Sequence, residues 1–420
     1  KRDTAENRMT ERDAPTPLRR SIRLIPLALY GVGVTVGAGI YVLTGAVAGT
    51  AGAAAPLSFL LAALLIAPTA FSFGELSSRM PFAAGEAAYV LAGFRLSWLS
   101  LLVGLMVVAG GIVSSATVTN GAAGYIGEMV PLPPFVIKIG FVTLLMGIAM
   151  WGVVQTVAVA ILFTLVETGG LLLIIAAGLA SPGEGATLRE MFLPFLVADG
   201  LPFFGLAGVT AGVMLAFFSF IGFEDMVNMA EETEAPERTM PRAIILTLCI
   251  TTLLYIATAA VALHTVAAAD LAASSAPLAL VFERATGHDA AFFAGIAVIA
   301  TVNTVLIQMV MASRVIYGLA GKGAVPALLG MVHPATQTPL IATALVAGII
   351  VALALFFPLE GLARTTSYIV LAVFALVNGS LVALKLKGAG PAAFTVPLAV
   401  PLLGALLSAA VLAVELWRVL

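Results

Sequence analysis

Residues 31–45 read GVGVTVGAGIYVLTG and place four glycines, at positions 31, 33, 37 and 39, in the middle of a long apolar segment. Glycine weakens a helix interior by about 1 kcal/mol relative to alanine, so this density disfavours an unbroken helix. In a lipid bilayer a broken helix is stable only where the freed backbone faces protein or a water-filled cavity. The stretch is therefore a candidate ligand site if the chain spans a membrane.

The composition is that of a membrane protein. The chain has 420 residues, of which 61% are hydrophobic and 10% charged, and its mean hydropathy is +1.11. Soluble domains carry about 25% charged residues. The net charge of −2 gives no basic footprint for nucleic acid. The expected partner is thus the lipid bilayer, and Cys249, inside an apolar run, is predicted to be a buried thiol.

Eleven apolar segments are long enough to be transmembrane helices, which need roughly 20 apolar residues. Their length and lack of alternation argue against the strands of an outer-membrane barrel. Their approximate ranges are 24–48, 54–79, 87–118, 135–154, 156–180, 203–230, 242–264, 290–320, 339–357, 362–385 and 395–418.

The distribution of Lys and Arg predicts the orientation. If residue 1 is cytoplasmic, 15 of the 20 basic residues lie inside. The five outside are Lys138, Arg189, Arg284, Arg364 and Arg418. The positive-inside rule then predicts a multi-pass protein of the cell (inner) membrane with a cytoplasmic N-terminus. Eleven spans put the C-terminus outside, whereas a twelfth would put it inside.

A second segment, VMLAFFSFIGFEDMVNMAEE at 213–232, is also interrupted. Ser219 and Gly222 lie in its middle, and Glu224 and Asp225 follow at once. A carboxylate at the bilayer centre costs about 2.5–3.5 kcal/mol on insertion scales and usually faces a cavity. The segment therefore predicts a half-helix, a short unwound stretch and a second half-helix.

Two interrupted segments that lie five segments apart are typical of a 5+5 inverted repeat. The predicted organisation is a cytoplasmic tail at 1–20, a transporter core at 21–390 and an accessory transmembrane helix at 391–420. Within the core, the first repeat covers about 24–180 and the second about 203–387. The fold class is all-α.

The breaks suit a ligand that carries both charges. Amide N–H groups at the start of a half-helix favour an anion, and the carbonyls that end the preceding half suit an ammonium group. An amino acid or related amine fits both. The alternative is close helix packing, because Gly33 and Gly37 have small-xxx-small spacing. The matching break in the second segment favours binding.

Four stretches of the chain carry a resemblance to a known family. They are TVGAGIYVLTG (35–45), FFSFIGFEDMVNMAEETEAPERTMPRAI (217–244), MASRVIYGLAGKGAVP (311–326) and TSYIVLAVFALVNGSLVALKLK (366–387). They resemble the amino acid–polyamine–organocation superfamily, and within it the bacterial, cationic-amino-acid-transporter-like permeases. The resemblance implies a LeuT-type fold, with discontinuous helices 1 and 6 and an accessory helix 11, and transport by alternating access.

The resemblance also implies roles for single residues. Gly37, Ala38 and Gly39 match the carboxylate-binding turn of the family. Phe218 matches an aromatic gate that is tryptophan in some arginine-exchanging relatives. The carbonyls expected to face the ammonium group are those of Thr35, Val36, Phe218, Ser219 and Ile221. Phe220 and Gly222 complete the predicted substrate site, and the apolar lining favours small neutral amino acids.

Glu167 lies in the middle of the fifth segment. In proton-coupled relatives a lysine at about this place fills the position of a sodium ion. We predict a proton-linked or gating role for Glu167, and a second such role for Glu224; a structural hydrogen bond is the alternative for each. The expected coupling ion is H⁺.

Sodium coupling stays open, with Ser313 and Thr304 as oxygen donors. Asn303 and Gln308 are predicted to hydrogen-bond between helices. The i,i+4 spacing of Glu75 and Arg79 predicts an ion pair.

The predicted function is a secondary active transporter of amino acids or related amines, working as a proton-linked symporter. An exchanger is the alternative, and an ion channel is disfavoured because both breaks lie in one pseudo-symmetric subunit. No catalytic motif lies within the apolar segments, so an enzyme is not expected. No cofactor or metal site is expected, because the three histidines are dispersed.

Overall fold

The computed structural model describes residues 20–81, 85–151, 157–183, 185–192, 203–321, 325–334 and 336–419. Of the predicted cytoplasmic tail, only residue 20 lies inside these ranges. The described residues form helices joined by short loops, and their β-structure is a single bridge between Ile22 and Thr233. The all-α fold class is therefore confirmed.

The helices follow the predicted segments closely. Among the described residues, nine stretches are long and apolar enough to cross a membrane, and two shorter apolar helices add to them. The first half contains α2 (Leu24–Ala51), η1 (Gly52–Ala54), α3 (Ala55–Arg79), α4 (Gly85–Phe94), α5 (Ser97–Met129), α6 (Pro134–Trp151), α7 (Val157–Ala180) and α8 (Leu188–Phe192). The second half contains α10 (Phe203–Phe218), η2 (Phe223–Glu232), α11 (Pro236–Thr265), α12 (Ala268–Ala273), α13 (Pro277–Thr286), α14 (Ala290–Gly321), η3 (Ala327–Gly330), α15 (Leu340–Phe356), α16 (Leu359–Leu386) and α17 (Ala399–Val419).

Two details of the prediction are wrong. The segment predicted at 87–118 is split, because Arg95 adopts a left-handed conformation (φ 59°) between α4 and α5. As a result, the spanning helix α5 begins later than predicted and runs on to Met129. Cys249 is exposed on α11 rather than buried; an exposed thiol on an apolar helix is compatible with lipid.

Both predicted interruptions are present. In α2 the backbone leaves helical geometry at Gly37 (φ −12°, ψ −141°), so one of the four glycines carries the break. The second segment has α10 up to Phe218, a turn, and then the 3₁₀ helix η2. Gly222 ends that turn at φ 126°, a backbone conformation that residues with a Cβ atom rarely adopt.

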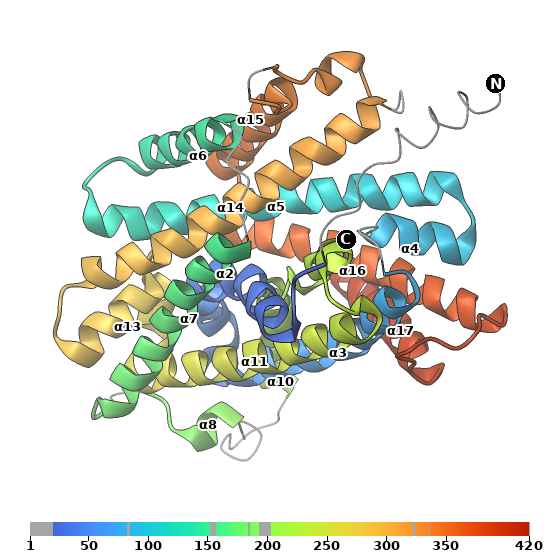
Figure 1. The fold of residues 1–420 in the computed structure, drawn as a ribbon. Helices are drawn as coiled ribbons and strands as arrows, with labels where there is room; N and C mark the ends of the chain where they lie inside the picture. Colours follow the sequence, from blue (N-terminus) through green and yellow to red (C-terminus); the bar gives the residue numbers. More distant parts are fainter. Residues whose placement is uncertain are drawn as a thin grey trace, which may run out of the picture.

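The interrupted helices occupy the centre of the bundle. α2 packs against α7, α10 and α11, and α5 packs against α14 and α16. Figure 1 shows α5 running through the molecule, with α6 and α15 side by side on one flank and α17 beside α16 on the other.

Aromatic rings fix the second half of the broken segment. Phe223 of η2 lies 5.7 Å from Phe73 of α3 and 5.6 Å from Phe374 of α16, between ring centroids. Phe217, just before the turn, packs against Phe374 at 6.0 Å. Such tilted and edge-to-face pairs contribute roughly 0.5–1.5 kcal/mol each beyond the area they bury. The break is thus held on both sides by packing, although its backbone is not helical.

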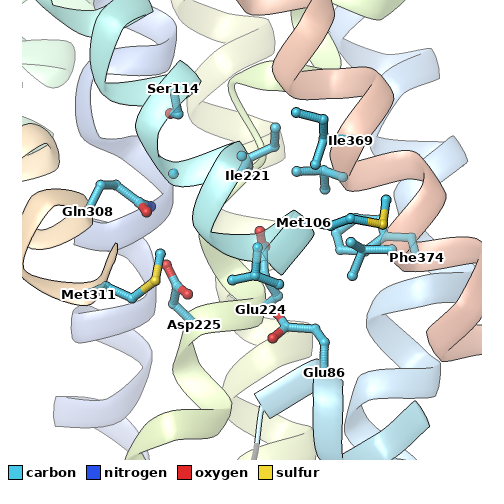
Figure 2. A pocket seen from close by; sticks show the side chains of 15 residues that line it. Glu86, Met106, Ser114, Ile221, Glu224, Asp225, Gln308, Met311, Ile369 and Phe374 are labelled. Carbon is cyan, nitrogen blue, oxygen red and sulfur yellow. The ribbon is translucent and has the colours of Figure 1, made fainter. Parts of the chain in front are cut away.

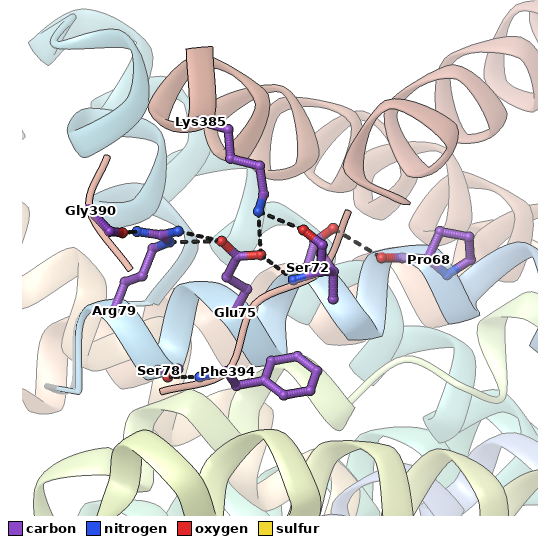
Figure 3. Close-up of polar contacts among 9 residues, drawn as sticks. Pro68, Ser72, Glu75, Ser78, Arg79, Lys385, Gly390 and Phe394 are labelled. Atoms are coloured by element: carbon purple, nitrogen blue, oxygen red, sulfur yellow. Dashed lines mark hydrogen bonds and ion pairs between the residues drawn. The ribbon is translucent and has the colours of Figure 1, made fainter. Parts of the chain in front are cut away.

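A buried carboxylate joins α3 to the loop between α16 and α17 (Figure 3). Glu75 accepts hydrogen bonds from Arg79 at 2.6 and 2.8 Å, which confirms the predicted pair. Its second oxygen lies 2.7 Å from Lys385 Nζ and accepts the Val396 amide at 2.8 Å. Arg79 also donates to the Gly390 carbonyl at 2.6 Å. The loop is therefore tied to α3 through one acid that has two cationic partners.

Candidate functional site

A small cavity lies where the two broken helices meet. Its volume is about 20 Å³, room for one or two water molecules. α2 contributes four lining residues, the end of α10 one, the turn after it two, α5 two and α14 two. They are Val34, Thr35, Gly37, Gly39, Ser114, Val118, Phe218, Ser219, Ile221, Thr304 and Gln308.

Six of the predicted site residues line this cavity: Thr35, Gly37, Gly39, Phe218, Ser219 and Ile221. The other four do not line it. Val36 is fully buried in the core, and Phe220 turns away to pack on Tyr255 at 4.9 Å between ring centroids. Gly222 lies against the Val34 carbonyl. Ala38 follows the break directly in α2.

Close backbone contact explains two of the glycines. A methyl group at Gly39 would lie 2.6 Å from the Ser219 Cα, so any larger residue would push the two breaks apart. A methyl group at Gly37 would collide with the Thr304 hydroxyl of α14. Gly31 and Gly33 instead face Met226 and Thr164, outside the cavity.

Tyr255 of α11 connects the two breaks. Its hydroxyl is within hydrogen-bond distance of the Thr35 carbonyl (2.6 Å) and the Ser219 carbonyl (2.7 Å). These are two of the carbonyls expected to face an ammonium group, and each keeps a second lone pair for such a ligand. Sequence reasoning missed this residue, although a tyrosine in the middle of an apolar segment is a signal worth following.

A second cavity of about 40 Å³ continues from the first (Figure 2). Both are lined by Ser114, Ile221 and Gln308. Three carboxyl groups, of Glu86, Glu224 and Asp225, line the second cavity. Apart from these acids, Ser114 and Gln308, the lining is apolar, so the predicted apolar lining is interrupted by polar groups on this side.

Within the described part of the chain, none of these three acids forms an ion pair. Glu224 accepts the Gly222 amide at 2.9 Å, and Gln308 hydrogen-bonds Asp225. The Oε1 atom of Gln308, a residue that is 8% exposed, is buried without a partner. The cavity thus combines three acids with an unpartnered amide oxygen, a lining that suits a cationic group.

Glu86 shows the electrostatic consequence. It lies at the start of α4, a 10-residue helix outside the spanning set, and only 7% of it is exposed. Burial, with a smaller contribution from the nearby Asp225 charge, raises the pKa of Glu86 from 4.5 to about 7. Desolvation and a like charge both disfavour the ionised form. Glu86 therefore changes charge near neutral pH.

Glu167 lies apart from both cavities. It is fully buried in α7, where its Oε1 accepts the side-chain amide of Asn303 at 3.1 Å. Tyr41 of α2 donates to its backbone carbonyl at 2.5 Å. Glu167 therefore contacts the second half of the broken helix rather than either cavity.

A wide cavity of about 980 Å³ opens at the end of α5 that carries Glu128. It reaches Val42 of α2 and Gly121 of α5, whereas the small cavity between the breaks reaches Gly39 and Val118. These pairs are three residues apart on each helix, about one helical turn. A layer of side chains about one helical turn thick therefore separates the wide cavity from the small cavity between the breaks.

A family model described as "Amino acid permease" matches residues 22–417, nearly the whole described chain. The chain belongs to this amino acid permease family. Membership places it in the amino acid–polyamine–organocation superfamily and gives the LeuT-type fold, in which α2 and the α10–η2 pair are the discontinuous helices. The permease is accordingly a multi-pass membrane protein related to amino acid transporters.

Three curated proteins that are similar to the permease are named after different substrates. Branched-chain amino acid permease BcaP of Bacillus subtilis (strain 168) is 28% identical, over 90% of this chain and 84% of BcaP. The methylthioribose transporter of the same organism is 30% identical, over 88% and 82%. Cationic amino acid transporter 4 of Homo sapiens is 30% identical, over 90% of this chain and 61% of the human protein.

Proposed function

We propose that the permease is a secondary active transporter that moves amino acids across the membrane by alternating access in proton-linked symport. The observation that carries the proposal is the meeting of the two broken helices, at Gly39 and Ser219, beside one cavity. The half-helix that begins after Gly37 presents amide groups without intrahelical partners, and these bind the substrate carboxylate. The carbonyls of the unwound stretches bind its ammonium group.

The second cavity takes the side chain of the substrate. Three carboxyl groups, of which those of Glu86 and Glu224 are buried, have no cationic partner in the described chain, and they favour a side chain that carries an amine or a guanidinium group. The name of the human relative, a cationic amino acid transporter, agrees with this chemistry, whereas the name of BcaP points to branched apolar side chains. We therefore propose basic amino acids as the preferred substrates and neutral amino acids as the second choice.

The cavity sizes require movement during transport. A volume of about 20 Å³ between the breaks is too small for an amino acid, yet a cavity of about 980 Å³ ends one turn away. A substrate can reach the site only if the layer at Val42 and Gly121 opens. On the other side, release passes Glu86 and Glu224 in the second cavity. This arrangement supports alternating access over a continuous pore.

Glu167 and Glu224 are the proposed coupling and gating residues, with a proton as the coupling ion. Glu224 braces the break by accepting the Gly222 amide. We place the permease in the cell membrane with a cytoplasmic N-terminus, which puts the wide cavity on the outside.

Counterflow in proteoliposomes tests the proposal. Vesicles loaded with unlabelled arginine, leucine or alanine take up the same labelled amino acid if the permease is a carrier. Gly39→Ala should reduce uptake at least tenfold, because the methyl group meets the Ser219 backbone. Gly140→Ala on α6, where a methyl group meets open space, is the matched control and should transport like the wild type.

Three results would contradict parts of the proposal. Absence of counterflow for every amino acid would remove the carrier function. Ion currents without counterflow would favour a channel. Counterflow that a pH gradient cannot convert into net accumulation would identify an exchanger.

A further inference from the structure

Glu167 of α7 and Asn303 of α14 form a polar pair in the centre of the bundle. Glu167 is 0% exposed and Asn303 is 2% exposed. The Asn303 amide nitrogen donates to Oε1 of Glu167 at 3.1 Å. The other oxygen of each group, Glu167 Oε2 and Asn303 Oδ1, is buried without a hydrogen-bond partner in the described chain. The pair thus has two unsatisfied acceptors and, among the described residues, no donor for either.

One proton satisfies both oxygens. A carboxyl group protonated on Oε2 becomes a donor, and the amide oxygen of Asn303 is an acceptor. Acid and amide then form two reciprocal hydrogen bonds, N–H to Oε1 and O–H to Oδ1. We propose that Glu167 carries a proton in this conformation and shares it with Asn303 in such a reciprocal acid–amide pair. This inference rests on the proposed proton-linked transport, and it identifies Asn303 as the residue that accepts the hydrogen bond from the protonated carboxyl group.

Among the described residues, the surroundings of Glu167 contain no charge that would stabilise its ionised form. The helices packed against α7 are α2, α11, α13 and α14. Their titratable groups near Glu167 are the phenols of Tyr41 and Tyr255. The charged residues of α13, Glu283 and Arg284, are exposed. No described cation forms an ion pair with Glu167.

The pair is connected to the break in α2 by two routes. Tyr41, four residues beyond Gly37, donates to the backbone carbonyl of Glu167. Thr304 follows Asn303 directly and lies against Gly37. With the proton, α7 and α14 are joined at the level of the break. Without it, two buried oxygens, one of them on a charged carboxylate, have no donor, so the two helices separate or water enters between them.

A monovalent cation held by the same two oxygens is the competing explanation. None of the three cavities described above is lined by Glu167 or Asn303. A proton needs no such space, whereas a sodium ion does. Among the described residues, no group of three or more His, Cys, Asp or Glu side chains is placed to hold a metal ion.

Infrared difference spectroscopy of the reconstituted permease over a pH titration tests the pair directly. The wild type should show the carbonyl band of a protonated carboxylic acid at neutral pH. Because Glu86 is also partly protonated at this pH, the test follows one component of the band. Glu167→Gln should remove that component, and Asn303→Leu should shift it by removing the hydrogen bond. Glu224→Gln, which removes a different buried carboxyl group, is the matched control and should leave it in place.

A second readout uses the geometry of the glutamine variant. Its amide can reproduce both hydrogen bonds, so Glu167→Gln should melt close to the wild type, whereas Glu167→Ala should melt lower. A band that is insensitive to Glu167→Gln or to Asn303→Leu would overturn the proposal. So would a wild-type band that disappears when sodium is added. These spectra are independent of transport, so their failure is distinguishable from a failure of the proposed function in counterflow.

Discussion

Two acidic clusters of the molecule, one around Glu75 and one in the second cavity, are built in opposite ways. Glu75 is fully buried but has Arg79 and Lys385 within 2.7 Å (Figure 3). Glu86, Glu224 and Asp225 line the second cavity without any ion pair among the described residues (Figure 2). The first cluster fastens a loop to α3. The second has no cationic partner among the described residues and lies in the proposed substrate site. This arrangement is expected of a site that binds a cationic substrate.

Removing the acid of the first cluster should have the largest effect. Glu75→Gln leaves Arg79 and Lys385 together with no anion, and breaking a buried ion pair costs about 3–5 kcal/mol. We expect the apparent Tm of the detergent-solubilised permease to fall by several degrees or more. Equal Tm values for this variant and the wild type would remove the distinction between the clusters.

The second cluster should respond to pH in the opposite sense from an ion-paired acid. The pKa of Glu86 is raised from 4.5 to about 7 in the folded protein. The folded state therefore binds the proton more tightly, and its stabilisation is complete below pH 4.5 and is lost as pH rises through 7. The loss should amount to at most about 3 kcal/mol.

Thermal unfolding between pH 5 and 8 measures this effect. Glu86→Gln removes the titrating group and should flatten the decline in stability as pH rises. An unchanged slope in Glu86→Gln would show that this side chain does not titrate in the folded permease.

A cation introduced into the second cluster should make it resemble the first, ion-paired cluster. Gln308 lies beside Asp225, so Gln308→Lys places an ammonium group among the unpaired acids. We expect Gln308→Lys to be more stable than Gln308→Met, a variant of similar size without charge, because a buried charge without a partner is costly. The same lysine should block binding of basic amino acids. A Gln308→Lys variant less stable than Gln308→Met would contradict the account of the cluster.

The smallest effect is expected at the surface. Arg23 and Glu234 form an ion pair at 3.3 Å, but their side chains are 79% and 45% exposed. Exposed pairs contribute about 0–1 kcal/mol because water and salt screen them. Arg23→Gln should leave the Tm nearly unchanged. A loss comparable to that of Glu75→Gln would mean that burial does not separate the strong pair from the weak one.

The fold is largely predictable from the sequence because apolar length and broken periodicity are local signals. The glycines at 31–39 and the Ser219–Gly222 turn predict both breaks. The sequence does not identify Gly37 as the break, because the contact with Thr304 depends on where α14 lies. Tyr255 escapes prediction for the same reason: it meets the Thr35 carbonyl across 220 residues of chain.

The acids of the second cavity are only partly predictable. Glu224 and Asp225 are visible next to the break, but their approach to Glu86 depends on how α4 folds back before Arg95. The left-handed conformation of Arg95 has no signature in its residue type. As a result, the sequence predicts an apolar pocket where three carboxyl groups gather.

The most direct test of the proposed site is ligand-dependent thermal stability of the purified permease with arginine and with leucine. A ligand at 100 times its Kd stabilises the folded state by about 2.7 kcal/mol. We predict that arginine raises the Tm more than leucine, and that Asp225→Asn abolishes the arginine shift while leaving the fold intact. A wild type stabilised equally by both amino acids, or by neither, would contradict a site in which the unpaired acids bind a cationic side chain.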